Sequence, residues 1–260
     1  MPSLKEIRKR LNNVVCGNRV VFHHLPKCGG TSVSRALRLW YLLSYAGFPS
    51  DPTYRAMEAL YPDRDEVWIR KAMLDFREKQ LLCFLFDDIR CIAGHVPFCE
   101  TAYNLFKERY NFITTLRDPV SLIMSLFFYD ATSSEDRWRF DGNIEAFLET
   151  PRAALFGTVY AHFFSGLPPD CDPQSRAVVE RAKANLGKFA VVGLVEDMTN
   201  FERRLRDILG IRLRIGHRNK ARVNDGERVR VVTDDVRRKI EELSTVNLEI
   251  YDYARRHLST

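Results

Sequence analysis

Four short, nearly continuous apolar runs occur along the chain, at residues 19–24, 89–93, 110–116 and 189–195. Runs of this length that are bounded by polar or glycine-containing segments predict buried strands. Strands buried on both faces are typical of parallel sheets, in which helices cover the two sides. Segments with helical periodicity alternate with the runs, so the pattern predicts an α/β protein with a central parallel sheet flanked by helices. The predicted helices cover residues 4–11, 33–41, 65–86, 119–129, 198–209 and 234–257.

The region between the first two runs has a different pattern. Residues 42–62 contain many turn-forming residues and show no clear period, so we expect them to be largely irregular. A chain of 260 residues supports one substantial core rather than two. We therefore expect a single domain over residues 1–260, with a helical insertion at about 42–88 and a possible basic lid at about 212–230.

Composition narrows the class of protein. Hydrophobic residues make up 45% and charged residues 28% of the chain, which excludes disordered and fibrous proteins. No apolar run approaches the roughly 18 to 20 residues of a membrane span, and the basic N-terminus lacks the apolar core of a secretory signal. We expect a soluble, non-exported, cytoplasmic protein. The six cysteines show no CxxC pair and no zinc-type spacing, so we expect free thiols and no metal.

The charge balance suggests an anionic partner. The net charge is +6, with a dense basic stretch at residues 203–230. Such a balance fits either nucleic acid or a small polyanionic ligand. The chain has neither the aromatic interleaving of a nucleic-acid stacking platform nor a helix-turn-helix signal, so a basic nucleic-acid-binding module is the weaker alternative.

A glycine-containing loop, Pro-Lys-Cys-Gly-Gly-Thr-Ser, follows the first predicted strand. Its two glycines, Gly29 and Gly30, allow a ligand to approach the backbone closely. The N–H groups at the start of the next helix are suited to bind an anion. Lys27 adds a full positive charge, and the hydroxyl groups of Thr31 and Ser32 can donate hydrogen bonds. The loop is therefore a candidate phosphate-binding site, although a simple glycine turn between strand and helix is the alternative.

A second polar segment follows the third predicted strand. Asp118 and Pro119 have the types expected of a helix N-cap and first helical residue. Arg117 then lies at the end of the strand, where a guanidinium can bind a phosphate with two hydrogen bonds. Ser121 and Ser125 share a face of the helix that follows, so one or both can join Arg117.

Together the two segments resemble the sulfotransferases that use 3′-phosphoadenosine 5′-phosphosulfate (PAPS). The run from His24 to Ser32 is similar to their HxxKTGGT loop, and Leu-Arg-Asp-Pro with Ser125 is similar to their RDPxxRxxS segment. The closest likeness is to the carbohydrate sulfotransferases of the heparan and dermatan 2-O type and their bacterial relatives, over about residues 18–210. The chain departs from the family pattern at Cys28, where the family has threonine, and at Leu122, where it has arginine.

The resemblance implies a P-loop-NTPase-like sulfotransferase fold, PAPS as co-substrate, no metal, and a role for each matching residue. Arg117 and Ser125 would bind the 3′-phosphate, and Lys27 would stabilise the bridging oxygen as it leaves. The acceptor would be a hydroxyl group, on a glycan or glycolipid. Because the Golgi relatives carry a membrane anchor and none is visible here, a bacterial cytosolic enzyme fits best. The residues that would hold the 5′-phosphosulfate are Lys27, Gly29, Gly30, Thr31 and Ser32.

His95 is the candidate general base, because imidazole titrates near neutral pH and this residue ends a predicted strand beside a glycine. A histidine in a similar context is the base that the 2-O-type resemblance implies. His23 and His24 compete for the role, but on a strand they face opposite sides, so only one can point into the site. We expect His24 to orient the loop and His23 to be packed. His162 carries no motif and is assigned to the framework.

Three weaker signals leave alternatives open. Glu196 and Asp197 follow the fourth predicted strand and can contact the acceptor, but they also suit a helix start. Residues 82–88 resemble a Walker B strand, which a nucleotide-dependent kinase needs to hold magnesium. The chain has no Walker A lysine next to the hydroxyl residue, so we interpret this segment as a helix end. Cys28 would be oxidation-sensitive if its positive surroundings lowered the thiol pKa.

Overall fold

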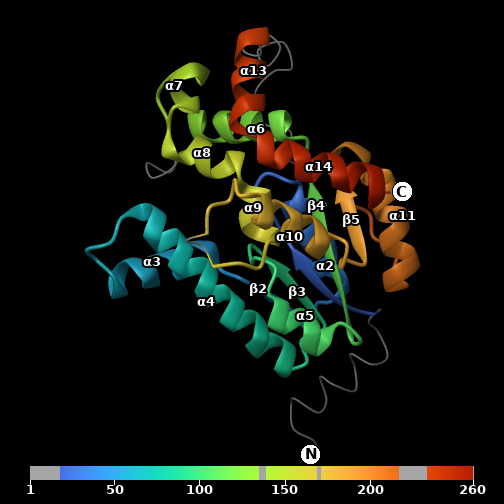
Figure 1. Ribbon diagram of the computed structural model, residues 1–260. Coiled ribbons are helices and arrows are strands. Elements are labelled where there is room, and N and C mark those ends of the chain that lie inside the picture. The colour runs from blue at the N-terminus through green and yellow to red at the C-terminus, as the bar shows by residue number, and fades with distance from the viewer. Residues whose placement is uncertain (1–17, 135–138, 169–170, 217–232, 260) are drawn as a thin grey trace, which may run out of the picture.

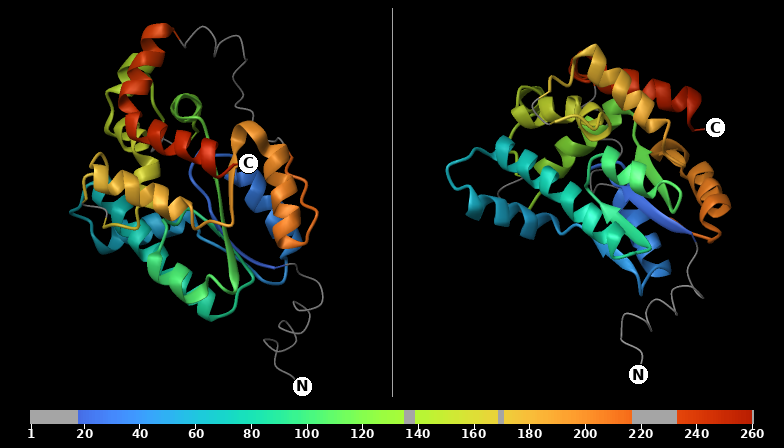
Figure 2. Two further views of the ribbon diagram at one scale, coloured as in Figure 1. Left: turned by 45° about the vertical axis from the view of Figure 1, so that its right-hand side comes forward. Right: turned by 60° about the horizontal axis from the view of Figure 1, so that its bottom comes forward.

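The computed structural model describes residues 18–134, 139–168, 171–216 and 233–259. The predicted helix at residues 4–11 and most of the predicted basic lid lie outside these ranges. Within them, five strands form one parallel sheet in the order β2-β3-β1-β4-β5, and helices cover both of its faces (Figures 1 and 2). The predicted α/β class with a central parallel sheet is therefore confirmed. The strands are β1 (Arg19–His23), β2 (Tyr45–Gly47), β3 (Cys91–Gly94), β4 (Tyr110–Leu116) and β5 (Val191–Leu194).

Strand β1 lies at the centre of the sheet. It pairs with β3 on one side and β4 on the other, with Val21 opposite both Ile92 and Phe112. Alternation along β1 sends Val20 and Phe22 into one hydrophobic core and Val21 into the other. The order of the strands reverses at β1, and ligands of such sheets bind beyond the carboxyl ends of the strands at this switch point.

Different helices cover the two faces. Helices α2 (Gly30–Trp40) and α11 (Met198–Leu209) form the smaller core with β1, and a short 3₁₀ turn, η1 (Val195–Asp197), leads from β5 into α11. Helix α3 (Ser50–Leu60) packs against α4 (Glu66–Phe86). The larger core draws on α4 and on α5 (Glu100–Phe106), α6 (Pro119–Ala131), α7 (Ile144–Leu148), α8 (Pro151–Gly157), α9 (Val159–Phe164), α10 (Arg176–Leu186), α13 (Asp234–Leu243) and α14 (Thr245–His257).

The region at residues 42–62 is more regular than its sequence predicts. It contains β2 and α3. Strand β2 has only three residues, and it obtains its hydrogen bonds by parallel pairing with β3, where Tyr45 lies opposite Cys91. Helix α3 begins just after Pro49 and carries Pro52 in its first turn, where proline is tolerated. The expectation of an irregular segment was wrong because its proline residues mark the start of a helix.

The predicted C-terminal helix at 234–257 is two helices. Helix α13 ends before Ser244, and α14 starts directly after it in a new direction (Figure 1). Neither glycine nor proline marks the break. A Cβ added to Gly157 of α8 would lie 2.4 Å from the Leu243 carbonyl oxygen, so α8 passes very close to this turn. Tertiary packing therefore bends the chain where the local sequence does not.

Helix α4 confirms the predicted helix at 65–86. The Asp65 side chain accepts a hydrogen bond from the Trp68 N–H at 2.8 Å and caps the N-terminus. The apolar residues 82–86 form its last turn, as the interpretation against a Walker B strand predicts. In the part of the chain that the structure describes, no helix is both long and apolar enough to cross a bilayer.

Candidate functional site

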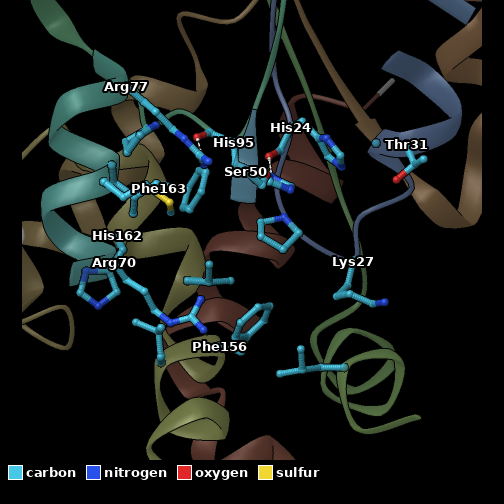
Figure 3. Close-up of a pocket in the computed structure, with 18 of the residues that line it drawn as sticks. His24, Lys27, Thr31, Ser50, Arg70, Arg77, His95, Phe156, His162 and Phe163 are labelled. Atoms are coloured by element: carbon cyan, nitrogen blue, oxygen red, sulfur yellow. Dashed lines mark hydrogen bonds between the residues drawn. The ribbon is translucent and has the colours of Figure 1, made fainter. Parts of the chain in front are cut away.

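A cavity of about 890 Å³ lies beyond the carboxyl ends of the strands (Figure 3). Loops that follow β1, β3 and β4 form one side of it, and α3, α4, α8 and α9 form the other. The residues predicted for the site come from three separate loops and the two helices α2 and α6, and all of them line this cavity. They are Lys27, Gly29, Gly30, Thr31, Ser32, His95, Arg117 and Ser125. Their individual roles stay predictions.

The loop after β1 has an unusual backbone. Gly29, which precedes α2, has a φ of 71°, and Lys27 has a φ of 63°, in the left-handed region that few lysines adopt. Arg117 Nη1 donates a hydrogen bond to the Lys27 carbonyl oxygen at 3.1 Å and holds this conformation. The first turn of α2 then begins beside the cavity, where the Ser32 N–H donates to the Gly29 carbonyl oxygen at 3.2 Å. N–H groups at a helix N-terminus can also bind an anion. Such strain is common at ligand-binding loops.

Gly30 allows this loop to pack against His24. A Cβ at position 30 would lie 1.7 Å from Cδ2 of the His24 ring. The His24 ring also stacks on Phe22, with ring centroids 5.6 Å apart, and lies 4.2 Å from the ring of His95. His24 therefore connects the loop to His95, which agrees with the expectation that it orients the loop.

Replacing Gly30 with alanine should destabilise the protein by about 1–3 kcal/mol, because the added methyl group overlaps the His24 ring. Thermal unfolding would measure the effect as a fall in Tm. Gly216→Ala is the matched control, since a Cβ there meets no described atom within 4 Å. Equal Tm values for the Gly30 variant and the control would contradict the close packing.

The Lys27 side chain points into the cavity, and its pKa is lowered. Its Nζ lies 3.8 Å from the centroid of the Tyr129 ring, within cation–π distance. Burial lowers the pKa of Lys27 to about 8. Asp130 opposes this shift, and the nearby positive charges of Arg117 and Arg152 add to it. A partly desolvated cation interacts strongly with an anion that enters the cavity.

Arg117 is held by the end of β4 and the start of α6. The Asp118 carboxylate accepts a hydrogen bond from the Ser121 N–H at 2.9 Å, and Pro119 is the first helical residue, so the predicted cap is confirmed. The Arg117 N–H donates to the Tyr160 hydroxyl at 3.0 Å. Ser125 lines the cavity one turn further along α6, whereas Ser121 is not part of its lining.

His95 has a defined tautomer. Its Nδ1 lies 2.5 Å from the His24 carbonyl oxygen, so Nδ1 carries the hydrogen and Nε2 keeps a free electron pair. Burial lowers the pKa of His95 to about 4, the hydrogen bond to His24 opposes this shift, and Arg77 adds to it. A neutral imidazole with a free Nε2 is the form that accepts a proton.

His23 faces the other way, as the strand alternation predicts. It is fully buried beside Phe112 and Phe189. Its Nδ1 donates to the Val96 carbonyl oxygen at 2.9 Å, and burial lowers its pKa to about 4. His23 is therefore packed in the core and does not compete with His95.

Helix α4 contributes residues that the sequence motifs did not reveal. Arg70, Arg77 and Glu78 line the cavity, and Arg77 and Glu78 follow Arg70 by seven and eight residues on the same side of the helix. Figure 3 shows Arg70 and Arg77. Arg77 is fully buried, and its Nη1 donates to the His95 carbonyl oxygen at 3.1 Å. Burial, with Asp75 nearby, raises the pKa of Glu78 to about 7. The helical spacing of these three residues is the only sequence pattern that could have identified them.

His162 of α9, which the sequence assigns to the framework, also lines the cavity. Burial lowers its pKa, and the nearby Lys71 adds to this shift. Its ring is therefore neutral at physiological pH. No motif surrounds this residue, and only the placement of α9 at the cavity brings it to the site.

Glu196 and Asp197 have structural roles. The Glu196 carboxylate accepts hydrogen bonds from the Asp118 N–H at 2.9 Å and from the Tyr251 hydroxyl at 3.0 Å. The Asp197 carboxylate caps α11 by accepting from the Asn200 N–H at 3.1 Å. Neither residue lines the cavity, so the helix-start interpretation is the correct one.

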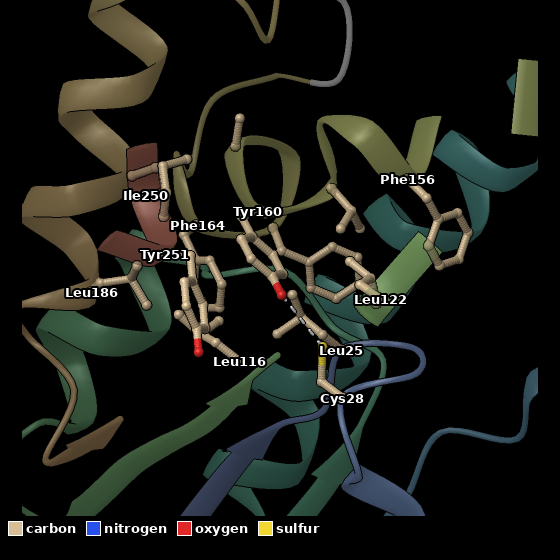
Figure 4. Close-up of a cluster of buried hydrophobic side chains, with 14 of the residues drawn as sticks. Leu25, Cys28, Leu116, Leu122, Phe156, Tyr160, Phe164, Leu186, Ile250 and Tyr251 are labelled. Atoms are coloured by element: carbon tan, nitrogen blue, oxygen red, sulfur yellow. Dashed lines mark hydrogen bonds between the residues drawn. The ribbon is translucent and has the colours of Figure 1, made fainter. Parts of the chain in front are cut away.

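Cys28 belongs to the hydrophobic core rather than to the cavity. Its side chain is fully buried, and its Sγ lies 3.8 Å from the Tyr160 hydroxyl (Figure 4). Burial raises the pKa of Cys28 to about 12, with the Tyr160 hydrogen bond opposing. The idea of an activated, oxidation-sensitive thiol was wrong, because the Cys28 side chain points into the core and away from the charges that line the cavity.

A central parallel sheet flanked by helices, with a cationic, glycine-containing loop at its switch point, defines the class as an α/β protein. Among the described residues, no group of histidine, cysteine, aspartate or glutamate side chains is arranged to hold a metal ion.

Comparison with known proteins gives a more specific similarity than the fold class alone. No protein-family model matches the chain. The chain is similar to heparan-sulfate 6-O-sulfotransferase 1 of Gallus gallus, with 26% identity over 275 aligned residues. The match covers 91% of this chain and 65% of that relative, so the chain spans somewhat less than two thirds of the relative's length. The similarity supports a carbohydrate sulfotransferase family. It gives no support to the expected 2-O subtype, because the relative is named for 6-O transfer.

Proposed function

We propose that this chain is a PAPS-dependent sulfotransferase that acts on a hydroxyl group of a carbohydrate-containing acceptor. The observation that carries the proposal is the convergence of Lys27, Arg117 and His95 in one cavity, from the loops after three different strands. Similarity to a sulfotransferase over most of the chain supports it.

The proposed step is an in-line transfer. In the proposed reaction, the acceptor oxygen forms a bond to sulfur while the bond from sulfur to the bridging phosphate oxygen breaks. His95 Nε2 accepts the proton of the acceptor hydroxyl. Lys27 Nζ stabilises the negative charge that develops on the departing oxygen. The products are a sulfate ester and adenosine 3′,5′-bisphosphate.

The donor end of the cavity fits the two anionic groups of PAPS. In this proposal, N–H groups at the left-handed turn of Gly29 and the start of α2 would bind the 5′-phosphosulfate. Arg117 suits the 3′-phosphate, since its Nε is buried and has no hydrogen-bond partner in the described part of the chain. An unsatisfied buried donor is costly, and a bound phosphate oxygen would satisfy it.

A kinase is disfavoured by the position of its candidate acidic residue. Asp88 follows α4 and pairs with Arg19 at 2.8 Å and with Arg109 at 2.6 Å. Arg19 begins β1, so this carboxylate lies at the amino edge of the sheet, opposite the cavity. It cannot hold a magnesium ion beside the loop. The basic stretch that motivated the nucleic-acid alternative falls largely outside the described residues.

Nucleotide binding tests the donor assignment. Adenosine 3′,5′-bisphosphate should raise Tm by several degrees, since a ligand at a hundred times its Kd stabilises the fold by about 2.7 kcal/mol. AMP, which lacks the 3′-phosphate, should have a much smaller effect. Ser125→Ala should weaken bisphosphate binding. Ser121→Ala is the matched control one turn away, and it should bind normally because Ser121 does not line the cavity. Equal shifts from the two nucleotides would contradict the assignment.

A further inference from the structure

Beyond His95, the cavity continues between α4, α8 and α9, and apolar side chains form much of its wall (Figure 3). We call this part the apolar chamber. Two residues from each helix define it: Met73 and Leu74 of α4, Leu155 and Phe156 of α8, and Val159 and Phe163 of α9.

The walls of the apolar chamber are accessible. Met73, Leu74 and Leu155 are only half-buried, although each lines the cavity. Phe156 and Phe163 complete the wall from the core side, where each is nearly buried. Apolar surface that faces an open cavity stays in contact with water until a ligand covers it, and covering it is favourable.

Most charges next to the apolar chamber are already compensated within the protein. Arg70 Nε donates to the Glu66 carboxylate at 3.0 Å. Arg152 Nη2 donates to the buried Asp130 carboxylate at 2.9 Å. The lowered pKa of His162 keeps its ring neutral. These groups offer little net positive charge to a polyanion.

Three further charged groups on this side line the cavity: Lys71, Arg77 and Glu78. The carboxylates of Asp51 and Asp75 also line it, but each pairs with a cation on its own helix, Asp51 with Arg55 at 3.0 Å and Asp75 with Lys79. Burial raises the pKa of Glu78 to about 7, and its carboxyl group suits the hydroxyl groups of a sugar.

We infer that the acceptor is an amphiphile: a saccharide with a hydroxyl group at His95 and an apolar aglycone that occupies the apolar chamber. This inference rests on the proposed function and narrows its acceptor.

Binding of matched glycosides tests the inference without relying on turnover. Calorimetry would compare methyl β-D-glucoside with octyl β-D-glucoside, below its micelle concentration, on protein saturated with adenosine 3′,5′-bisphosphate. Octyl glucoside should bind at least about tenfold tighter, the effect of roughly two buried methylene groups. Met73→Gln and Leu155→Gln should each reduce this ratio. Leu60→Gln is the control, since Leu60 of α3 is 65% exposed and does not line the cavity.

The outcomes separate the inference from the proposed function. Equal affinity for the two glucosides, on protein that still binds the bisphosphate, overturns the amphiphilic acceptor and leaves the donor assignment intact. Tighter binding of a sulfated heparin oligosaccharide than of octyl glucoside, with a steep loss in salt, also overturns it. Tight binding of octyl glucoside without any bisphosphate binding supports the apolar chamber as a ligand site and contradicts the proposed sulfotransferase.

Discussion

His95→Ala is expected to lower kcat by about 10² to 10⁴, the usual contribution of a positioned general base. Affinity for adenosine 3′,5′-bisphosphate should hardly change, because the base acts on the acceptor hydroxyl and not on the donor. Transfer of labelled sulfate from PAPS measures the first quantity, and calorimetry measures the second.

The pH profile gives this prediction a second readout. His95 accepts a proton only when it is neutral, and its pKa is lowered to about 4, so kcat/KM should fall as the pH drops through about 4. Lys27 acts as a cation, and its pKa is lowered to about 8, so kcat/KM should also fall as the pH rises through about 8. The His95 variant should lose only the acidic limb.

His24→Ala is the matched control for His95. The His24 ring fills the space beside Gly30, and the backbone carbonyl oxygen of His24 accepts a hydrogen bond from His95 Nδ1. Replacing the ring with a methyl group should therefore disturb the loop as well. Its loss should weaken nucleotide binding and turnover together. A His95→Ala enzyme that keeps its activity and its acidic limb would show that another group is the base.

Lys27→Ala is expected to lower kcat by about 10² or more, a loss of roughly 3 kcal/mol of electrostatic stabilisation in the transition state. PAPS binding should fall less than turnover, because the charge on the bridging oxygen develops only as its bond to sulfur breaks. Lys27→Arg should recover part of the activity, since it keeps the charge and changes the geometry. If the alanine variant binds PAPS weakly but turns over normally at saturation, Lys27 serves only in binding.

Local sequence determined much of the fold and the donor end of the site. The apolar runs predict four of the five strands, because a strand buried on both faces needs nearly continuous apolar residues. The Asp118–Pro119 pair predicts the start of α6, because capping and a proline φ act within a few residues. Strand alternation separates His23 from His24 for the same local reason.

Only the tertiary structure decided the acceptor end. Strand β2 is too short to be recognised alone and exists through its pairing with β3. The break at Ser244 follows from close packing against Gly157. Arg77 of α4 donates a hydrogen bond to the His95 carbonyl oxygen, and His162 of α9 lines the same cavity, because the fold places both helices around it. Such contacts join residues far apart in the chain, and no local pattern records them. The sequence alone thus determines a glycine-containing loop with a lysine at the end of a central parallel strand, whereas helix packing decides what lies opposite it.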